Sequence, residues 1–195
     1  MWPWEHAAVG YLLFSLGLRA LGREPPTERE TVLLVAATQL PDLVDKPLSW
    51  GLGWFPSGFA VAHSAFVAVP AGLAAIALGW RAGRTRAGIA TVVGYWSHLA
   101  GDVLNPVRYG GVPLPARVLW PVADVTPYET DYGLGRGFVY VGEFLASLPP
   151  TDPVEVLVFY VALPASSLAL WLRDGAPGTT TVGRLIAVSR HRIRQ

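Results

Sequence analysis

Residues 87–104 decide the fold class of this chain, and they read AGIATVVGYWSHLAGDVL. A helix needs about 20 mostly apolar residues to cross the core of a lipid bilayer, and this stretch meets that requirement. It also carries Ser97, His98 and Asp102. His98 and Asp102 stand four positions apart, so a helix places both side chains on one face. The stretch therefore predicts a membrane helix with a polar pair inside it.

Four further apolar segments are expected to form helices, roughly over residues 6–21, 31–40, 59–79 and 154–172. The third is the most continuous, and Pro164 predicts a kink in the last. The first is marginal in length, and the second is short enough to be re-entrant. The fold prediction is therefore all-α: a multi-pass membrane helix bundle of four or five spans with a Pro/Gly-rich outer loop region.

Two parts of the chain are expected, a single membrane-embedded helical domain over residues 1–175 and a polar, basic C-terminal tail over residues 176–195. Within the first part, the long region 105–153 is rich in proline, glycine and aromatic residues. It predicts a structured loop with one short helix, residues 138–148, on the membrane surface. The basic tail is expected to lie against anionic lipid headgroups.

The composition supports a lipid environment. Hydrophobic residues make up 52% of the 195 positions and charged residues only 15%, against about 25% charged in an average soluble domain. The net charge of +1 gives no overall field for nucleic acid, so none is expected as a partner. The chain has no cysteine, so a metal ion would have to be bound by His, Asp, Glu or water.

Arginines set the predicted orientation. They cluster in three regions: between the first and second segments, between the third and fourth, and after the fifth. With five spans, all three regions fall on one side of the membrane, which should be cytoplasmic by the positive-inside rule. The prediction is a multi-pass protein of the cell membrane with a cytoplasmic tail and its opposite loops on the extracytoplasmic face.

The same topology brings the ionisable residues of the apolar segments together. His6 begins the first segment, and Asp42 and Asp45 end the second. His63 lies in the first turns of the third, and the pair described above ends the fourth. All of them are expected at the extracytoplasmic end of the bundle, whereas His191 lies in the tail. Ionisable groups inside a membrane protein are costly to bury and usually functional.

A cluster of this kind predicts a divalent metal site. Histidine and carboxylate ligands without thiolate suit zinc first, with manganese or iron as alternatives. Each residue also has a structural interpretation: His6 as an interfacial anchor, Asp42 as a turn cap, and His98 with Asp102 as a hydrogen-bonded pair between helices. The metal site is preferred because it explains all of them together.

The sequence resembles the bacterial and archaeal membrane-bound metal-dependent hydrolases, a family of inner-membrane proteins that includes a LexA-associated member. The resemblance covers roughly residues 1–125. It is carried by His6, the Leu-Pro-Asp-Leu-Val-Asp run at 40–45, His63-Ser64 and the Ser97-His98-x-x-x-Asp102 motif. The start Trp-Pro-Trp-x-His and the run at 38–47 look most like archaeal members.

That family is in turn distantly similar to zinc-dependent phospholipase C and the single-strand-specific zinc nucleases. The resemblance implies metal ligation by a set of five residues: His6, Asp42, His63, His98 and Asp102. Asp45 and Asp102 are the carboxylates expected to act in catalysis. No histidine follows Asp102 until His191, so one or two ions are implied rather than three, and the open candidates for further ligands are Asp124, Glu129, Asp131 and Glu143.

Three functions compete. The first is a metal-dependent membrane hydrolase that acts on a phosphoester or a lipid-linked phosphate by metal-activated water; it makes the lipid bilayer, and a phospholipid or lipid-linked substrate, the expected partners. Arg108 and Arg117 would then hold the phosphate or anchor the loop at the interface. The second is a transporter component, which the lack of ionisable residues in the inner halves of segments three and five disfavours. The third is a non-catalytic membrane protein whose His/Asp cluster is structural. No protein partner is implied.

Overall fold

The structure is a computed structural model that describes residues 1–123, 125–147, 154 and 156–181. Within these ranges every regular element is helical. The long helices are α1 (Pro3–Ala20), α2 (Glu28–Lys46), α3 (Ala65–Arg81) and α4 (Thr85–Leu104). A π-helical stretch, η5 (Val156–Ala162), runs into α7 (Leu163–Arg173). The predicted all-α fold is therefore confirmed, while most of the predicted tail lies outside the described residues.

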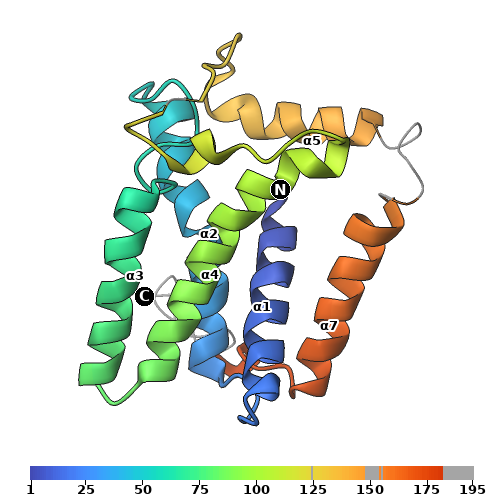
Figure 1. The fold of residues 1–195 in the computed structure, drawn as a ribbon. Coiled ribbons are helices and arrows are strands. Elements are labelled where there is room, and N and C mark those ends of the chain that lie inside the picture. The colour runs from blue at the N-terminus through green and yellow to red at the C-terminus, as the bar shows by residue number, and fades with distance from the viewer. Residues whose placement is uncertain (124, 148–153, 155, 182–195) are drawn as a thin grey trace, which may run out of the picture.

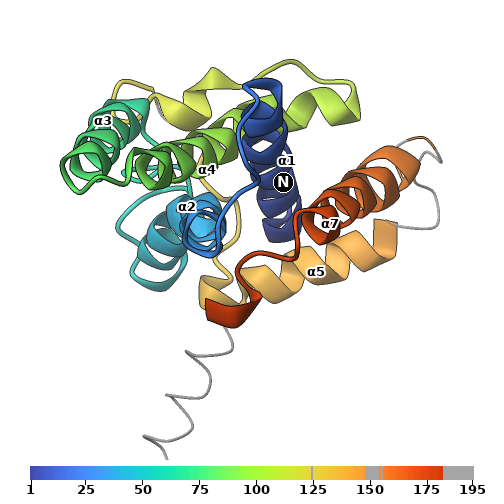
Figure 2. The ribbon, with the colours of Figure 1, turned by 90° about the horizontal axis from the view of Figure 1, so that it is seen from below.

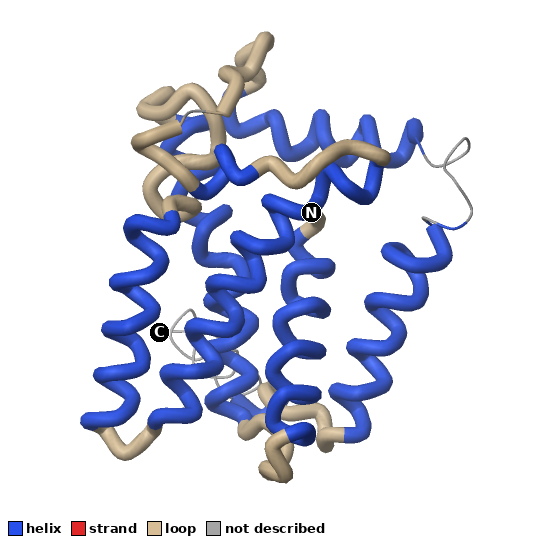
Figure 3. Tube along the Cα trace, viewed as in Figure 1, coloured by secondary structure: helices blue, strands red, loops and turns tan. Residues whose placement is uncertain are grey.

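The long helices run alternately down and up, as Figures 1 and 3 show. Seen along the bundle, α3, α4, α1 and α7 follow one another, with α2 packed beneath α4 and α1 (Figure 2). The starts of α1 and α3 and the ends of α2 and α4 consequently share one end of the bundle. The predicted convergence of the four polar segments at one end is thus observed.

Glycines allow α4 to approach its neighbours closely. A Cβ added at Gly94 would lie 2.4 Å from the carbonyl oxygen of Leu34 on α2. One added at Gly88 would lie 2.5 Å from the carbonyl oxygen of Ala75 on α3. Both distances are shorter than any tolerable contact, so only glycine fits, as is common where membrane helices pack through small residues. This packing fixes the depth of α4, and with it the position of His98 and Asp102.

Two helices differ in extent from the prediction. The second segment, expected to be short, forms the 19-residue helix α2: it begins earlier, where Thr27 and Glu30 make a capping box, and it continues past residue 40 to Lys46. Pro41 lies inside this helix, which carries Asp42 and Asp45 in its last turns. The third segment begins later than predicted: α3 starts at Ala65, with the Ser64 hydroxyl accepting a hydrogen bond from the amide of Phe66. Residues 59–64 are a loop that carries His63.

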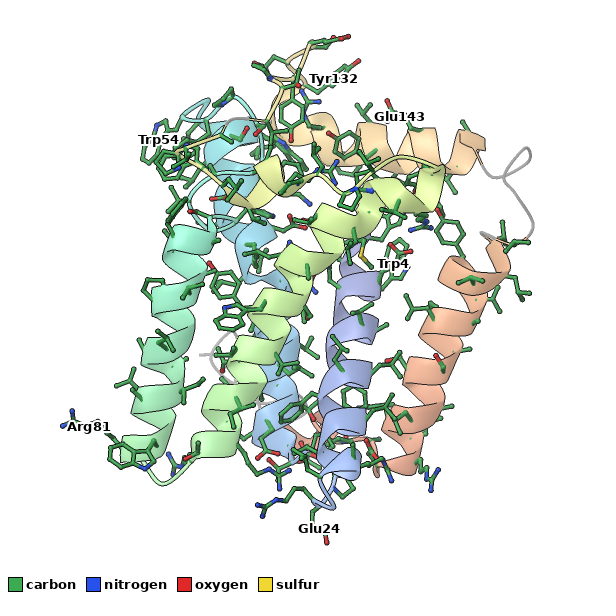
Figure 4. The ribbon with its side chains drawn as sticks, viewed as in Figure 1. Trp4, Glu24, Trp54, Arg81, Tyr132 and Glu143 are labelled. Carbon is green, nitrogen blue, oxygen red and sulfur yellow. The ribbon has the colours of Figure 1, made fainter. Side chains whose placement is uncertain are left out.

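Residues 105–147 cover the site end of the bundle. Three short 3-10 helices, η2 (Asn105–Tyr109), η3 (Pro115–Val118) and η4 (Gly133–Gly135), lead into α5 (Arg136–Ser147). The predicted short helix at residues 138–148 is confirmed by α5, which lies across the ends of the long helices (Figure 1). Arg81 and Glu24 mark the opposite end in Figure 4.

By length and composition, one described helix can cross a membrane: Val156–Arg173, with a mean hydropathy of 1.7. It combines η5 and α7, and the change from π to α geometry falls beside Pro164. The apolar helix Ala65–Arg81 is shorter. The predicted count of four or five spans therefore stays a prediction.

Candidate metal centre

Four side chains from three segments meet at the site end: Asp42 from α2, His63 from the loop before α3, and His98 and Asp102 from α4. Each offers one ligand atom, and these atoms lie within 4.8 Å of one another. The side chains of both histidines are fully buried, and that of Asp102 is nearly so. Asp42, with 12% of its side chain exposed, is the most open member. We call these four residues the His/Asp cluster.

The spacing within the cluster matches the ligand shell of a small cation. The two Nε2 atoms of His63 and His98 are 3.2 Å apart, and they lie 3.4 and 3.2 Å from Oδ2 of Asp102. They lie 3.6 and 3.7 Å from Oδ1 of Asp42. Ligands bound tetrahedrally at zinc–nitrogen distances would be about 3.4 Å from one another. The four atoms are therefore arranged around one point at the separations that a zinc-sized ion requires.

His63 is oriented by Asp45. Its Nδ1 lies 2.8 Å from Oδ2 of Asp45, which also accepts hydrogen bonds from the amides of Ala60 and His63. The other oxygen of Asp45 accepts from the amide of Ala62. A carboxylate facing Nδ1 places the proton there and leaves Nε2 as a free lone pair, which is the usual arrangement behind a metal-ligating histidine.

His98 has an equivalent partner on the backbone. Its Nδ1 lies 2.6 Å from the carbonyl oxygen of Thr38 on α2. A carbonyl oxygen can only accept, so Nδ1 carries the proton and Nε2 is again unprotonated in the neutral ring. When both rings are neutral, the two histidines therefore point bare nitrogen atoms at each other and at a carboxylate. Groups that only accept hydrogen bonds repel one another at these distances unless a cation or a proton lies between them.

The charge of the site favours a cation at His63. Burial by itself lowers the pKa of the His63 imidazole, but hydrogen bonds with the site carboxylates, Asp102 first, outweigh it and raise that pKa to about 10. The two carboxylates of the cluster thus make this position favourable for positive charge, whether it is a proton or a metal ion.

Lys46 holds the remaining carboxylate oxygen of the cluster. Its ammonium group forms an ion pair with Oδ2 of Asp42, one helical turn earlier, which leaves Oδ1 facing the histidines. The only lysine in the sequence is thus the partner of a cluster carboxylate. Asp42 is thereby oriented to present a single oxygen to the cluster.

His6 lies beside the cluster rather than in it. Its ring stacks on that of His98, with centroids 3.8 Å apart and planes at 16°. Its Nε2 is 3.4 Å from Oδ1 of Asp102, the oxygen that the cluster does not use, and the amino group of Met1 lies 3.1 Å from the same oxygen. Both ring nitrogens of His6 are buried and have no hydrogen-bond partner. The predicted ligand His6 is therefore close enough to Asp102 to share it.

A cavity of about 1370 Å³ adjoins the cluster on the side of Asp42 and Asp102. Lys46, Arg117 and Asn105 contribute polar groups to its lining, together with many aromatic side chains. This volume exceeds that of most ligand pockets, about 300–1,000 Å³. The cluster therefore forms part of the wall of an accessible space and is not sealed in the core.

The structure brings together all six site residues predicted from the sequence. Four of them form the His/Asp cluster, while His6 and Asp45 contact members of the cluster from outside it. Asp45, predicted as a catalytic carboxylate, contacts His63 from behind and is fully buried. Glu143 lines the cavity, and Asp131 accepts a bond from the amide of Gly133. These two and Glu129 are not in the cluster formed by the described residues, and Asp124 lies outside those residues.

The contact of His98 with the carbonyl oxygen of Thr38 was not predicted, since a backbone carbonyl leaves no signal in the sequence.

A family described as YdjM inner membrane protein matches residues 1–186 of the chain. Because the match spans nearly the whole chain, the protein belongs to this family, and membrane association is established. The family description says nothing of hydrolysis, so the predicted likeness to zinc-dependent phospholipase C stays a prediction. No curated protein and no solved structure matches the chain.

Proposed function

We propose that this member of an inner membrane protein family is a metal-dependent hydrolase that acts on a phosphoester or a lipid-linked phosphate. The observation that carries the proposal is the His/Asp cluster at the wall of the large cavity. Structural zinc sites are closed by their protein ligands, whereas catalytic sites keep a position for water or substrate. A cluster that borders an open cavity supports the second type.

The ligands proposed for one divalent ion, zinc first and manganese or iron as alternatives, are the four cluster residues. His6 and Oδ1 of Asp102 are the groups available to a second ion. In such a site a divalent ion lowers the pKa of water and polarises a phosphoryl oxygen. Hydrolysis would consume one water, break a P–O bond and release an alcohol and a phosphate.

The chain's own residues have distinct roles in this proposal. Asp45 and the carbonyl of Thr38 hold the two imidazoles with Nε2 toward Asp42 and Asp102. Lys46 keeps Asp42 presenting one oxygen. Asp42 is the most exposed ligand and borders the cavity, so it is the one that substrate or water would replace. With a single ion bound, Oδ1 of Asp102 is the candidate general base, while the contacts of Asp45 favour a positioning role over the catalytic one predicted from the sequence.

The proposal also includes the topology. The alternating helices and the arginines gathered at the far end support a multi-pass arrangement with the metal site toward the extracytoplasmic face and the tail in the cytoplasm. Cysteine scanning tests this, because the native chain has no cysteine. A cysteine at Pro56 should be labelled from outside intact cells, and one at Gly83 should not.

The first experiment is the metal content of the detergent-purified protein by mass spectrometry, alongside the His98→Ala/Asp102→Ala double variant. We expect near-stoichiometric zinc, manganese or iron in the wild type and its loss in a folded double variant. A phosphoester screen then tests hydrolysis. If the wild type binds no metal even after reconstitution, the cluster is a structural hydrogen-bonding group and the hydrolase proposal is wrong.

A further inference from the structure

The cavity beside the His/Asp cluster has two chemically different sides. Near the cluster it is polar, with Asp42, Asp102 and Arg117 in its lining. Away from the cluster its lining is mainly aromatic, with Trp2 and Trp4 of the N-terminal segment and Phe144 and Tyr160, and it also includes the charged residues Arg108 and Glu143. A space with a polar end and a mainly aromatic end fits an amphiphile better than a small polar molecule.

The apolar side is a continuous aromatic wall that joins three elements. Trp2 stacks on Trp4, with centroids 5.0 Å apart, and meets the edge of Phe144 of α5 at 4.9 Å. Phe144 in turn lies 5.2 Å from Tyr160 of η5. Trp4 is 47% exposed and lies on the side of α1 that faces α7, beneath α5 (Figure 4). The wall therefore leads from inside the cavity to the lateral surface of the bundle.

That lateral surface is the one most suited to contact lipid. Val156–Arg173 is the described helix that can span a membrane, and only 6% of this span is buried. It packs on α1 through its far half, where Asp174 accepts hydrogen bonds from Tyr11 and Ser15. The near half supplies Tyr160 to the cavity lining instead. Between α1 and η5 the cavity therefore borders the expected lipid phase.

Arg117 supplies an anion-binding group at the polar end. Its Nη1 donates a 2.8 Å hydrogen bond to the backbone carbonyl of Asp102, and its guanidinium lies 4.9 Å from the ring centroid of Phe59. Arg117 also lines the cavity next to Asp102. A guanidinium held beside the cluster and facing the cavity is suited to bind a phosphate oxygen.

Arg108, the other arginine considered from the sequence, has a different setting. It forms a 2.8 Å ion pair with Glu5, and both side chains are almost entirely buried. It also lies over the ring of Tyr160 at 4.5 Å. These contacts tie the loop after α4 to the start of α1, which is a structural role. Both arginines line the cavity, but Arg117 is the one that contacts the backbone of Asp102 in the cluster.

On the basis of the proposed function, we infer that the substrate is a membrane-anchored phosphate. Its phosphate lies between the His/Asp cluster and Arg117, and its apolar chain lies along the aromatic wall. It reaches the site sideways from the bilayer, between α1 and η5. A water-soluble phosphoester would leave the wall unused and bind more weakly.

The test measures binding, so it does not depend on turnover. The purified full chain, reconstituted with zinc, is titrated with a brominated-chain dodecyl phosphate that quenches the fluorescence of nearby tryptophans. Competitors are inorganic phosphate and a neutral dodecyl amphiphile of the same chain length. We expect each to compete at least about 100-fold more weakly than dodecyl phosphate, since each lacks one of the two recognised parts.

Variants assign the two parts. Arg117→Gln should weaken dodecyl phosphate binding by about 10- to 100-fold, as expected for a lost charge-assisted bond, with partial recovery in Arg117→Lys. Arg81→Gln, at the far end of the bundle, is the matched control and should change nothing. Trp4→Ala should weaken binding of the chain but not of inorganic phosphate.

Equal binding of inorganic phosphate and dodecyl phosphate would overturn the inference, as would equal binding of the neutral amphiphile. Neither result would affect the hydrolase proposal if metal binding and phosphoester hydrolysis are observed. Conversely, selective and Arg117-dependent binding in a protein that binds no metal would support the ligand class and remove the hydrolase proposal. The two ideas can thus fail separately.

Discussion

Two buried carboxylates at opposite ends of the bundle, Asp102 and Asp174, differ in the groups that surround them. Asp174, just after α7, accepts hydrogen bonds from the hydroxyls of Tyr11 and Ser15 at 2.8 and 2.6 Å, and it pairs with Arg19. Tyr11, Ser15 and Arg19 all donate hydrogen bonds to this carboxylate. Such a network is complete without any further group, and it fastens α7 to α1.

Asp102 accepts a hydrogen bond from the amino group of Met1 at Oδ1, but its Oδ2 faces histidine nitrogens that carry no proton in the neutral rings. The Nδ1 atoms of His63 and His98 are occupied by acceptors behind them, so their bare Nε2 atoms meet Oδ2 of Asp102 at 3.4 and 3.2 Å. A positive charge at the centre, either a proton on His63 or a metal ion, is needed to stabilise this network. The difference teaches how to separate a structural polar cluster from a cation site: the first pairs donors with acceptors, and the second gathers acceptors around one point.

The largest expected difference between the two ends is in metal affinity. It is tested by removing a proposed ligand near Asp102 and, separately, a hydrogen bond to Asp174. His63→Ala should reduce metal affinity more than about 100-fold, because loss of a ligand costs more than loss of an outer partner. Tyr11→Phe, which removes one donor to Asp174, should leave metal affinity unchanged. Titration of the metal-free proteins with zinc measures both. Similar affinities in the two variants would mean that the clusters do not differ as described.

A smaller effect is expected from Asp45→Asn. The asparagine still offers an oxygen but no longer holds the Nδ1 proton of His63 through a charge, so zinc affinity should fall about 10- to 100-fold. The control is Glu30→Gln, which changes another buried carboxylate, at the arginine-rich end. If Asp45 were a catalytic base instead of a positioning residue, hydrolysis would be lost at unchanged zinc affinity.

Asp174→Asn should affect stability and not metal content. Hydrogen bonds to a charged group contribute about 1.5–3 kcal/mol each, and the variant weakens several of them. We expect a melting temperature lower by about 5 °C, with zinc stoichiometry equal to that of the wild type. Loss of zinc in this variant, with the fold retained, would contradict the separation of the two ends.

The smallest expected effect is the pH dependence of the stability that the Asp174 carboxylate contributes. Burial raises the pKa of Asp174, but hydrogen bonds from Ser15, Tyr11 and Arg19 outweigh it, so the folded-state pKa is lower than normal. A depressed folded pKa gives stability that is fully present above the unfolded value of about 3.9 and is lost as pH falls through the folded value. The difference in melting temperature between wild type and Asp174→Asn, measured in chelator, should therefore be constant from pH 7 to 5 and shrink below about pH 4. A difference that grows on acidification would show the opposite sign of linkage.

The sequence alone predicted the all-helical fold and which residues gather at one end of the bundle. Apolar segments of near-spanning length predict helices because backbone groups in lipid must bond internally, and the observed helices alternate in direction along the chain. The positions of His6, Asp42, His63, His98 and Asp102 relative to segment ends then placed them at one end of the bundle.

Only the tertiary structure decided what each residue does there. Spacing along one helix explains why His98 and Asp102 share a face, but the distance between His63 and His98 depends on how α2, α4 and a loop pack. The exact approach of α2 to α4 rests on Gly94, and it brings the Thr38 carbonyl to His98. Likewise, Arg108 and Arg117 are alike in sequence and differ because one meets Glu5 and the other the Asp102 carbonyl. Such contacts join residues far apart in the chain, so no local pattern encodes them.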